Sequence, residues 1–244
     1  MNKKAYILMV FEGEKTEKQI SDNMKRYFLN ESANTVVYGF HCGEIYSLYN
    51  KLQKDQDLEL FPLLKENLQH KNSMLKAIER EQVAEMYLFF DYDGHATSAD
   101  DEKLKNMLEL FDNETEDYGK LYISYPMAEA IKHLNTQSDY RTLLAISEPK
   151  YKSIVSQDGD TSLKNLVILT KENWKIIIEE NSKKVNFVVN NDYSFPDEQI
   201  QQIEIFEKQK EKYLDIHNKV AVLSAFPIFL ADYYGYAKLR EIIK

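Results

Sequence analysis

Carboxylate side chains follow two short apolar runs of this 244-residue chain, at points where buried strands are expected to end. The two groups are Glu12 and Glu17 after Ala5–Phe11, and Asp91 and Asp93 after Met86–Phe90. Carboxylates that converge at one edge of a sheet repel one another unless cations lie between them. Hard oxygen ligands of this kind suit Mg²⁺ or Mn²⁺. The sequence therefore predicts a divalent-metal site and metal-assisted chemistry on phosphate groups.

The spacing within each group is consistent with that chemistry. Gly13 lets the backbone turn sharply after the strand and lets a phosphate approach. Glu17 is expected in the first turn of the next helix, where the helix dipole favours a carboxylate. Asp91 and Asp93 form an i, i+2 pair, and both side chains can bend toward one ion where the strand ends. Either motif alone is also typical of a solvated turn, so the prediction rests on their joint occurrence in this order.

Alternating apolar runs and helical patterns predict the elements that carry these residues. We expect strands at Ala5–Phe11, Thr35–Phe40, Met86–Phe90 and Leu121–Ser124. Helical patterns cover residues 17–30, residues 43–82 with a break near Pro62, residues 99–111 and residues 127–134. Strand and helix in alternation indicate an α/β fold, a mostly parallel sheet flanked by helices. In such a sheet, sites lie beyond the carboxyl ends of the strands.

The character of the chain changes near residues 135–145. Beyond this point we expect a mainly helical region, with helices over Leu163–Ile178, Asp197–Tyr213 and Val220–Ile243, the last one interrupted near Pro227. The predicted division is an α/β domain over residues 1–140 and a mainly helical region over residues 141–244.

Composition limits the classes of function. With 31 basic and 40 acidic residues the net charge is −9, which is unusual for a protein that binds nucleic acid through phosphate contacts. Bound metal ions would supply local positive charge, and weak intrinsic affinity or delivery of substrate by a partner is expected. A single cysteine, Cys42, excludes an internal disulfide and fits a reducing compartment. No apolar stretch resembles a signal peptide or approaches a membrane span, so we expect a cytoplasmic protein without membrane contact.

Three segments resemble the TOPRIM family. Phe11–Glu17 (FEGEKTE) resembles the opening motif of TOPRIM domains, and in particular the EGxxTE of RloB-like proteins. Leu88–Asp93 (LFFDYD) is similar to the DxD strand end of the family. Tyr122–Glu129 (YISYPMAE) is similar to the RloB-type segment that carries serine, proline and glutamate after the fourth strand. The resemblance covers about residues 5–134.

The resemblance implies a Rossmann-like TOPRIM fold with a metal-dependent nuclease site, as in topoisomerases, primases, OLD-family nucleases and bacterial anti-phage effectors. By position it implies these roles: Glu12 as general acid/base or ligand of a first metal, Asp91 and Asp93 as metal ligands, Glu17 as ligand of a second metal, and Glu129 as a supporting acid. Lys132, one turn beyond Glu129, could stabilise transition-state charge. Ser124 and His95 are candidate substrate contacts, with a structural hydroxyl and a solvated loop histidine as the alternatives.

No G-x-x-x-x-G-K-[ST] motif occurs, so a motor, if one is needed, would be an ATPase encoded as a separate chain. Assembly into a homo-oligomer is also compatible with the sequence. Three hypotheses of function stay open. The first is a Mg²⁺- or Mn²⁺-dependent nuclease acting on DNA or RNA, with phage defence as its role. The second is a non-catalytic regulatory or interaction module that keeps the TOPRIM shape, which the acidic charge and the helical C-terminal part favour. The third is a nucleotidyl- or phosphotransferase acting on small nucleotides.

Overall fold

A computed structural model describes residues 5–29, 35–42, 45–55, 58–70, 72–92, 101–134, 139–146 and 150–244. The chain divides into two compact units. The first unit comprises Met1–Phe89 and Ser98–Leu121, and the second comprises Phe90–Thr97 and Tyr122–Lys244. The predicted division near residue 140 concerns folding domains and stays a prediction.

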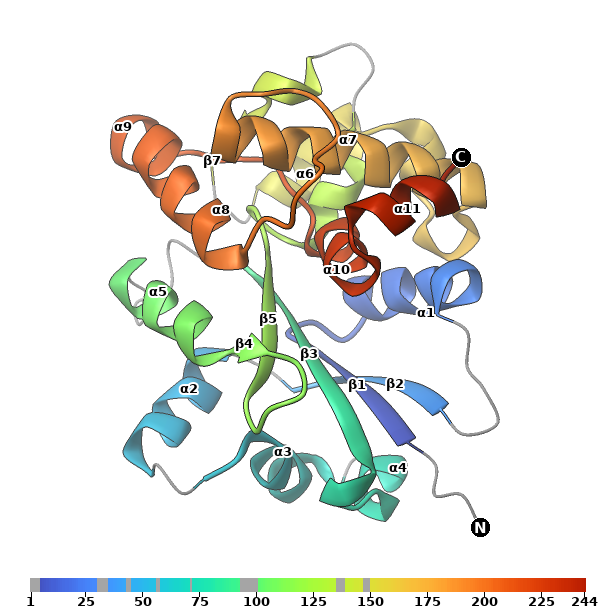
Figure 1. Ribbon diagram of the computed structural model, residues 1–244, viewed down its shortest axis with the longest axis vertical. Helices are drawn as coiled ribbons and strands as arrows, with labels where there is room; N and C mark the ends of the chain where they lie inside the picture. Colours follow the sequence, from blue (N-terminus) through green and yellow to red (C-terminus); the bar gives the residue numbers. More distant parts are fainter. Residues whose placement is uncertain are drawn as a thin grey trace. The chain divides into compact units, whose positions relative to one another are not determined.

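A five-stranded sheet in the order β2-β1-β3-β5-β4 begins in the first unit (Figure 1). Its strands are β1 (Ala5–Phe11), β2 (Thr35–His41), β3 (Val83–Asp91), β4 (Asp112–Asn113) and β5 (Gly119–Ser124). β1 pairs in parallel with both β2 and β3, whereas the short β4 pairs antiparallel with β5. The expected α/β fold with a mostly parallel sheet is therefore confirmed.

The apolar runs explain the central position of β1. Its last five residues are buried, as expected for a strand that is covered on both faces. The helices of this unit are α1 (Thr16–Phe28), α2 (Ile45–Lys54), α3 (Leu60–Leu68), α4 (Ser73–Ala77), the 3₁₀ turn η1 (Arg80–Gln82) and α5 (Asp101–Leu110). In α1, Ile20, Met24 and Phe28 are all buried. Their spacing of four residues turns one stripe of α1 toward the core.

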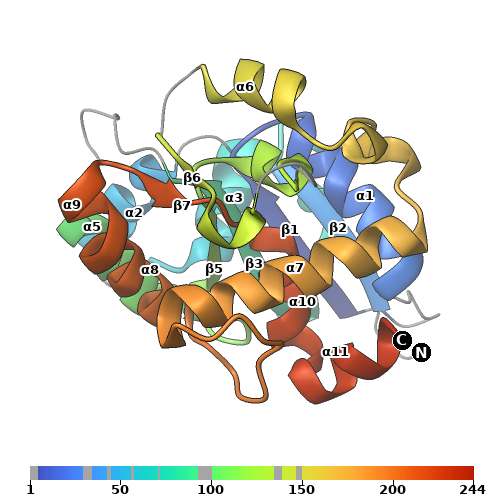
Figure 2. The ribbon, with the colours of Figure 1, turned by 90° about the horizontal axis from the view of Figure 1, so that it is seen from above.

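The second unit is mainly helical and holds a two-stranded antiparallel sheet, β6 (Leu144–Ala145) with β7 (Val220–Ala221). Its α- and π-helical segments are α6 (Tyr151–Asp158), α7 (Lys171–Asn190), α8 (Gln202–Gln209), η6 (Lys210–Leu214, π-helical), α9 (Asp215–His217), α10 (Ala225–Tyr234) and α11 (Tyr236–Ile242). Its 3₁₀ turns are η2 (Ala128–Lys132), η3 (Tyr140–Thr142), η4 (Thr161–Leu163) and η5 (Leu166–Ile168). The 20-residue α7 packs against α8 and α10 (Figure 2).

The helix break predicted near Pro227 was wrong, and the break predicted near Pro62 falls a few residues earlier, between α2 and α3. Pro62 lies in the first turn of α3, and Pro227 lies in the first turn of α10. A proline is tolerated there because the first N–H groups of a helix have no partner within it. The last break instead falls at Gly235, whose φ of 73° a residue with a side chain rarely adopts.

The helix predicted over Leu163–Ile178 was also wrong at both ends. Its first part forms η4 and η5, and α7 begins only at Lys171. Thr170 fixes this start because its hydroxyl accepts the Asn173 N–H, while the Asn173 side chain accepts the Thr170 N–H. Over the described ranges, no helix is long and apolar enough to cross a bilayer.

Candidate functional site

In the first unit, the loop after β1 fixes the position of Glu12. The Glu12 N–H donates to the Phe89 carbonyl oxygen at 3.3 Å, which carries the β1–β3 contact one residue beyond the strand. On the other side, the Cys42 N–H donates to the Phe11 carbonyl oxygen at 2.9 Å. These two hydrogen bonds hold the Glu12 backbone at the carboxyl end of β1. The half-buried Glu12 side chain is therefore attached to a backbone position that is fixed.

Gly13 and Glu17 form a closed contact within this loop. The Gly13 N–H donates to Glu17 Oε1 at 2.8 Å, and Glu17 is only 5% exposed. A Cβ at Gly13 would lie 2.6 Å from each of the two Glu17 carboxylate oxygens. The glycine is thus required by the Glu17 carboxylate, which fills the space where the sequence predicted the approach of a phosphate. The role of Glu17 as a metal ligand stays a prediction.

A pocket of about 390 Å³ lies beside this loop in the first unit. It is lined by residues of the loop, α1, the end of β2 and the segment after α3: Phe11, Gly13, Glu14, Lys18, Tyr38, Gly39, Phe40, His41, Cys42, Leu68 and Asn72. His41 Nδ1 lies 3.7 Å from Glu14 Oε1. Burial, and secondarily the charge of Glu12, raise the pKa of the Cys42 thiol. The Glu12 carboxylate is therefore close enough to Cys42 to oppose its ionisation.

In the second unit, Asp91 is tied to the short helix η2. Its Oδ1 accepts the backbone N–H of Ala128, the first residue of η2, at 2.8 Å. The next residue, Tyr92, donates its N–H to the Ser124 carbonyl oxygen at 2.9 Å. Asp91 thus satisfies an N–H of a helix start that has no partner within the helix. Its carboxylate is held in a fixed orientation beside the segment that carries Glu129 and Lys132.

Glu129 and Lys132 belong to a charged group on η2. Glu129 is 9% exposed, and its Oε1 lies 3.6 Å from the Nζ of Lys152 on α6. Burial lowers the pKa of Lys132, the charge of Lys152 lowers it further, and the charge of Glu129 opposes both effects. Sequence reasoning missed Lys152, which lies in no motif and reaches this group through the packing of α6 on η2.

The remaining predicted residues differ in what the structure says of them. Ser124 is buried, and its Oγ accepts the Ala225 N–H at 3.2 Å at the start of α10. Its hydroxyl is therefore engaged within the protein, and a contact with substrate stays a prediction. Asp93 and His95 lie outside the described residues. The structure thus associates Gly13 with Glu17 near Glu12 in one unit, and Asp91 with η2 in the other.

Among the residues that the structure describes, no group of three or more His, Cys, Asp or Glu side chains is arranged to hold a metal ion. Asp93, half of the predicted DxD pair, is not among these residues, so the predicted metal site as a whole is not tested. The side chains that the sequence assigned to metal are all carboxylates, and carboxylate oxygens are suitable ligands for Mg²⁺ or Mn²⁺.

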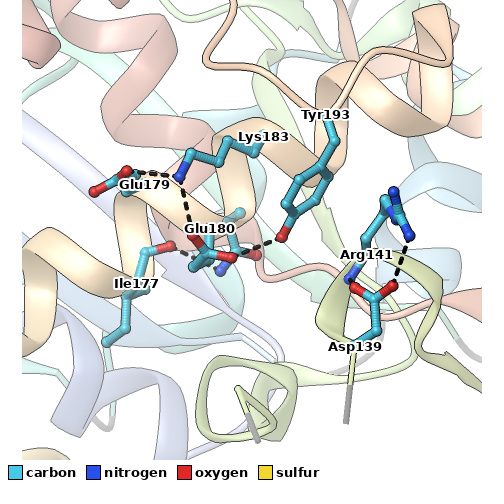
Figure 3. Close-up of polar contacts among 8 residues, drawn as sticks. Asp139, Arg141, Ile177, Glu179, Glu180, Lys183 and Tyr193 are labelled. Atoms are coloured by element: carbon cyan, nitrogen blue, oxygen red, sulfur yellow. Dashed lines mark hydrogen bonds and ion pairs between the residues drawn. The ribbon is translucent and has the colours of Figure 1, made fainter. Parts of the chain in front are cut away.

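A polar network on α7 lay outside every motif (Figure 3). Tyr193 donates its hydroxyl hydrogen to Glu180 Oε2 at 2.6 Å, and Lys183 Nζ lies 3.2 Å from Glu180 Oε1. The Arg141 guanidinium, held by Asp139 at 2.9 Å, lies over the Tyr193 ring. Lys183 Nζ also lies 2.6 Å from Glu179 Oε1, and the contacts of Tyr193 and Arg141 fasten η3 and the segment after α7 to α7.

A fully buried lysine lies one residue further along α7. Lys184 Nζ donates to the Leu143 carbonyl oxygen at 2.7 Å and lies 4.2 Å from the centre of the Tyr140 ring. Burial lowers the pKa of Lys184 well below its usual value. These contacts join α7 to the segment that leads into β6, which indicates a structural role.

Comparisons of the chain with protein-family models, with curated proteins and with solved structures found no match. The assignment of a function therefore rests on the residues and on the geometry given above.

Proposed function

We propose that this chain is a Mg²⁺- or Mn²⁺-dependent nuclease of the TOPRIM type, which hydrolyses phosphodiester bonds in DNA or RNA. The observation that supports it is the parallel pairing of β1 with β3, in register up to Phe11 and Phe89. Parallel neighbours end at the same edge of a sheet, and Glu12 and Asp91 are the acidic residues that follow these last pairs.

In this proposal Asp91 and Asp93 hold the metal, and Glu12 acts as a further ligand or as the general base toward water. Glu17 and Glu129 support the site, and the second metal of the family would fall to Glu17. A bound divalent ion would lower the pKa of water and stabilise charge on the phosphate. The hydrogen bond from Ala128 fixes the direction of the Asp91 carboxylate, which limits its freedom before any ion is bound.

Lys132 completes the proposed constellation by stabilising negative charge that develops on the phosphate. Gly13, Ser124 and His95 keep their proposed roles as substrate contacts. The same family analogy extends to four further proposals. These are a role in phage defence, an ATPase partner encoded separately, assembly of several copies and a location in the cytoplasm.

The test is metal-dependent cleavage of a panel of single- and double-stranded DNA and RNA by the purified chain. Glu12→Gln and Asp91→Asn should each abolish cleavage. The asparagine keeps an oxygen that can accept the Ala128 N–H, so Asp91→Asn removes charge while preserving the helix contact. Glu14→Gln is the matched control, because the Glu14 side chain is 83% exposed and belongs to the same loop. Cleavage by both core variants at the rate of the control would reject the proposal.

A non-catalytic module is the second candidate, and a specific observation favours it. The Glu17 carboxylate accepts a hydrogen bond within its loop, and Asp91 accepts one from Ala128, so both have structural work without metal. A calorimetric titration with Mn²⁺ discriminates the two candidates, because the module would give no heat of binding. Small nucleotides added to the substrate panel, with product analysis, would detect nucleotidyl or phosphoryl transfer instead.

A further inference from the structure

An acidic protein that acts on nucleic acid needs a local group of cations. The chain carries a net charge of −9, so its average field repels a phosphate backbone. Phosphate contacts through lysine and arginine supply most of the affinity of non-specific nucleic-acid binding. In the described part of the second unit, two lysines on η2 and α6 lie close to the segment that is hydrogen-bonded to the proposed metal ligand Asp91.

This group consists of Glu129, Lys132 and Lys152. Successive turns of a 3₁₀ helix repeat every three residues, so Glu129 and Lys132 on η2 point in the same direction. Lys152 reaches the same place from α6 and lies 3.6 Å from Glu129. The group thus holds two cations and one carboxylate, and the Asp91 carboxylate is hydrogen-bonded to the same short helix. Glu129 is 9% exposed, whereas the side chain of Lys152 is 63% exposed and accessible to a ligand.

Lys152 lies on a helix that is firmly attached, because α6 packs on η2 and is hydrogen-bonded to that segment near both of its ends. At the first end, the Tyr151 hydroxyl and His133 Nδ1 are hydrogen-bonded at 3.0 Å. Just beyond the other end, the Asp160 N–H donates to the Lys132 carbonyl oxygen at 3.0 Å. A Cβ at Gly159 would lie 2.9 Å from that carbonyl oxygen, so glycine permits the close approach.

The same short helix connects this group to Asp91. Ala128 donates its N–H to the Asp91 carboxylate, and Glu129 is the next residue along η2. Burial and the charge of Lys152 both lower the pKa of Lys132. An added anion would relieve the repulsion between the two ammonium groups and stabilise the charged form of each.

We propose that Lys132 and Lys152 together bind a backbone phosphate of the nucleic-acid substrate, and that Glu129 compensates the charge of the two ammonium groups in the absence of substrate. This inference rests on the proposed nuclease function and adds to it a defined phosphate contact. Lys152 is then a substrate-binding residue, although nothing in the sequence around it marks it as one.

The test is the affinity for fluorescently labelled single- and double-stranded oligonucleotides, measured by anisotropy in EDTA on the Glu12→Gln background. The double variant Lys132→Ala/Lys152→Ala removes the whole phosphate contact and should weaken binding about eightfold at 0.1 M salt, since one phosphate contact contributes a slope of about 0.9 in log K against log salt. Lys132→Ala and Lys152→Ala should each weaken binding by a smaller factor. The double variant should also reduce that slope by about 1. Glu129→Gln should tighten binding, because it removes the carboxylate that competes with the phosphate.

Lys164→Ala is the control, since Lys164 is an exposed lysine of the same unit and should leave both affinity and slope unchanged. Unchanged binding in Lys132→Ala and Lys152→Ala, or no binding by the parent protein at low salt, would overturn the inference. The two proposals fail in different ways. Binding that depends on these lysines, without cleavage by the wild type, would reject the nuclease but keep the phosphate contact. Cleavage that is insensitive to both lysines would keep the nuclease and reject the phosphate contact.

Discussion

A methyl group at Gly13 is expected to destabilise the protein by displacing the Glu17 carboxylate. In Gly13→Ala the new Cβ would lie 2.6 Å from both carboxylate oxygens, a distance that real Cβ atoms do not tolerate. The carboxylate must move, and the 2.8 Å hydrogen bond from the Gly13 N–H is then lost. A hydrogen bond to a charged group contributes about 1.5–3 kcal/mol, so we expect a loss of about 2 kcal/mol. For a chain of this length this corresponds to a fall in Tm of about 4–8 °C.

A double-mutant cycle in urea isolates this contact. The free energy of unfolding is measured for the wild type, Gly13→Ala, Glu17→Ala and the double variant. Because Glu17→Ala empties the space beside Gly13, the alanine at position 13 should then cost less than about 0.5 kcal/mol. The coupling energy between the two positions should therefore be about 1.5–3 kcal/mol.

Gly235→Ala provides the control for the cycle. Its φ of 73° strains any residue with a side chain, but no atom lies within 4 Å of a Cβ built there. It should cost about 1–2 kcal/mol in either background, without coupling to Glu17. Additive effects of Gly13→Ala and Glu17→Ala would refute the reasoning, and would mean that the space beside Gly13 is open to a ligand.

Three further predictions concern titratable groups. Since burial and the charge of Glu12 raise the pKa of Cys42, its alkylation by iodoacetamide at pH 7.5 should be slow and should accelerate in Glu12→Gln; equal rates would place the carboxylate elsewhere. Burial lowers the pKa of His133, so the unfolded chain binds the extra proton first, and stability present above about pH 6.5 is lost as the pH falls through the folded pKa. Urea unfolding at pH 7.5 and pH 5.5 should show a smaller acid-induced loss in His133→Asn than in the wild type, and an equal loss would contradict this. The lowered pKa of Lys184 means that the unfolded chain binds the extra proton, so stability should rise as the pH increases toward the unfolded pKa of about 10.4. Lys184→Met should abolish this rise, and a variant that keeps it would show that another group is responsible.

The parts of the fold that sequence reasoning obtained are those with a strong local pattern. The buried run of β1 and the four-residue spacing of Ile20, Met24 and Phe28 in α1 report burial directly. The two-residue strands β4, β6 and β7 have no period to detect, and only tertiary packing makes them pair. The helix break at Pro227 was mispredicted because the effect of a proline depends on its position within the helix. The sequence alone does not show at which residue the helix begins.

The same distinction between local pattern and tertiary packing applies to the candidate site. Carboxylates at strand ends could be found from the sequence, because each follows its own apolar run. The hydrogen bond between Glu17 and Gly13 could not be predicted from the sequence, because it depends on the angle at which α1 leaves β1. The contribution of Lys152 could not either, because it requires α6 to pack on η2 about twenty residues further along the chain.

The pairing of two distant backbone positions within the second unit has a consequence for recombination. The Tyr125 N–H donates to the Leu223 carbonyl oxygen at 2.8 Å, and the Leu223 N–H donates to the Tyr125 carbonyl oxygen at 2.9 Å. Both residues belong to the second unit. A crossover between these two positions would pair the Tyr125 segment of one parent sequence with the Leu223 segment of another. We therefore expect that homologous exchange in nature spares this interval, and that chimaeras made by crossing over within it accumulate poorly in cells.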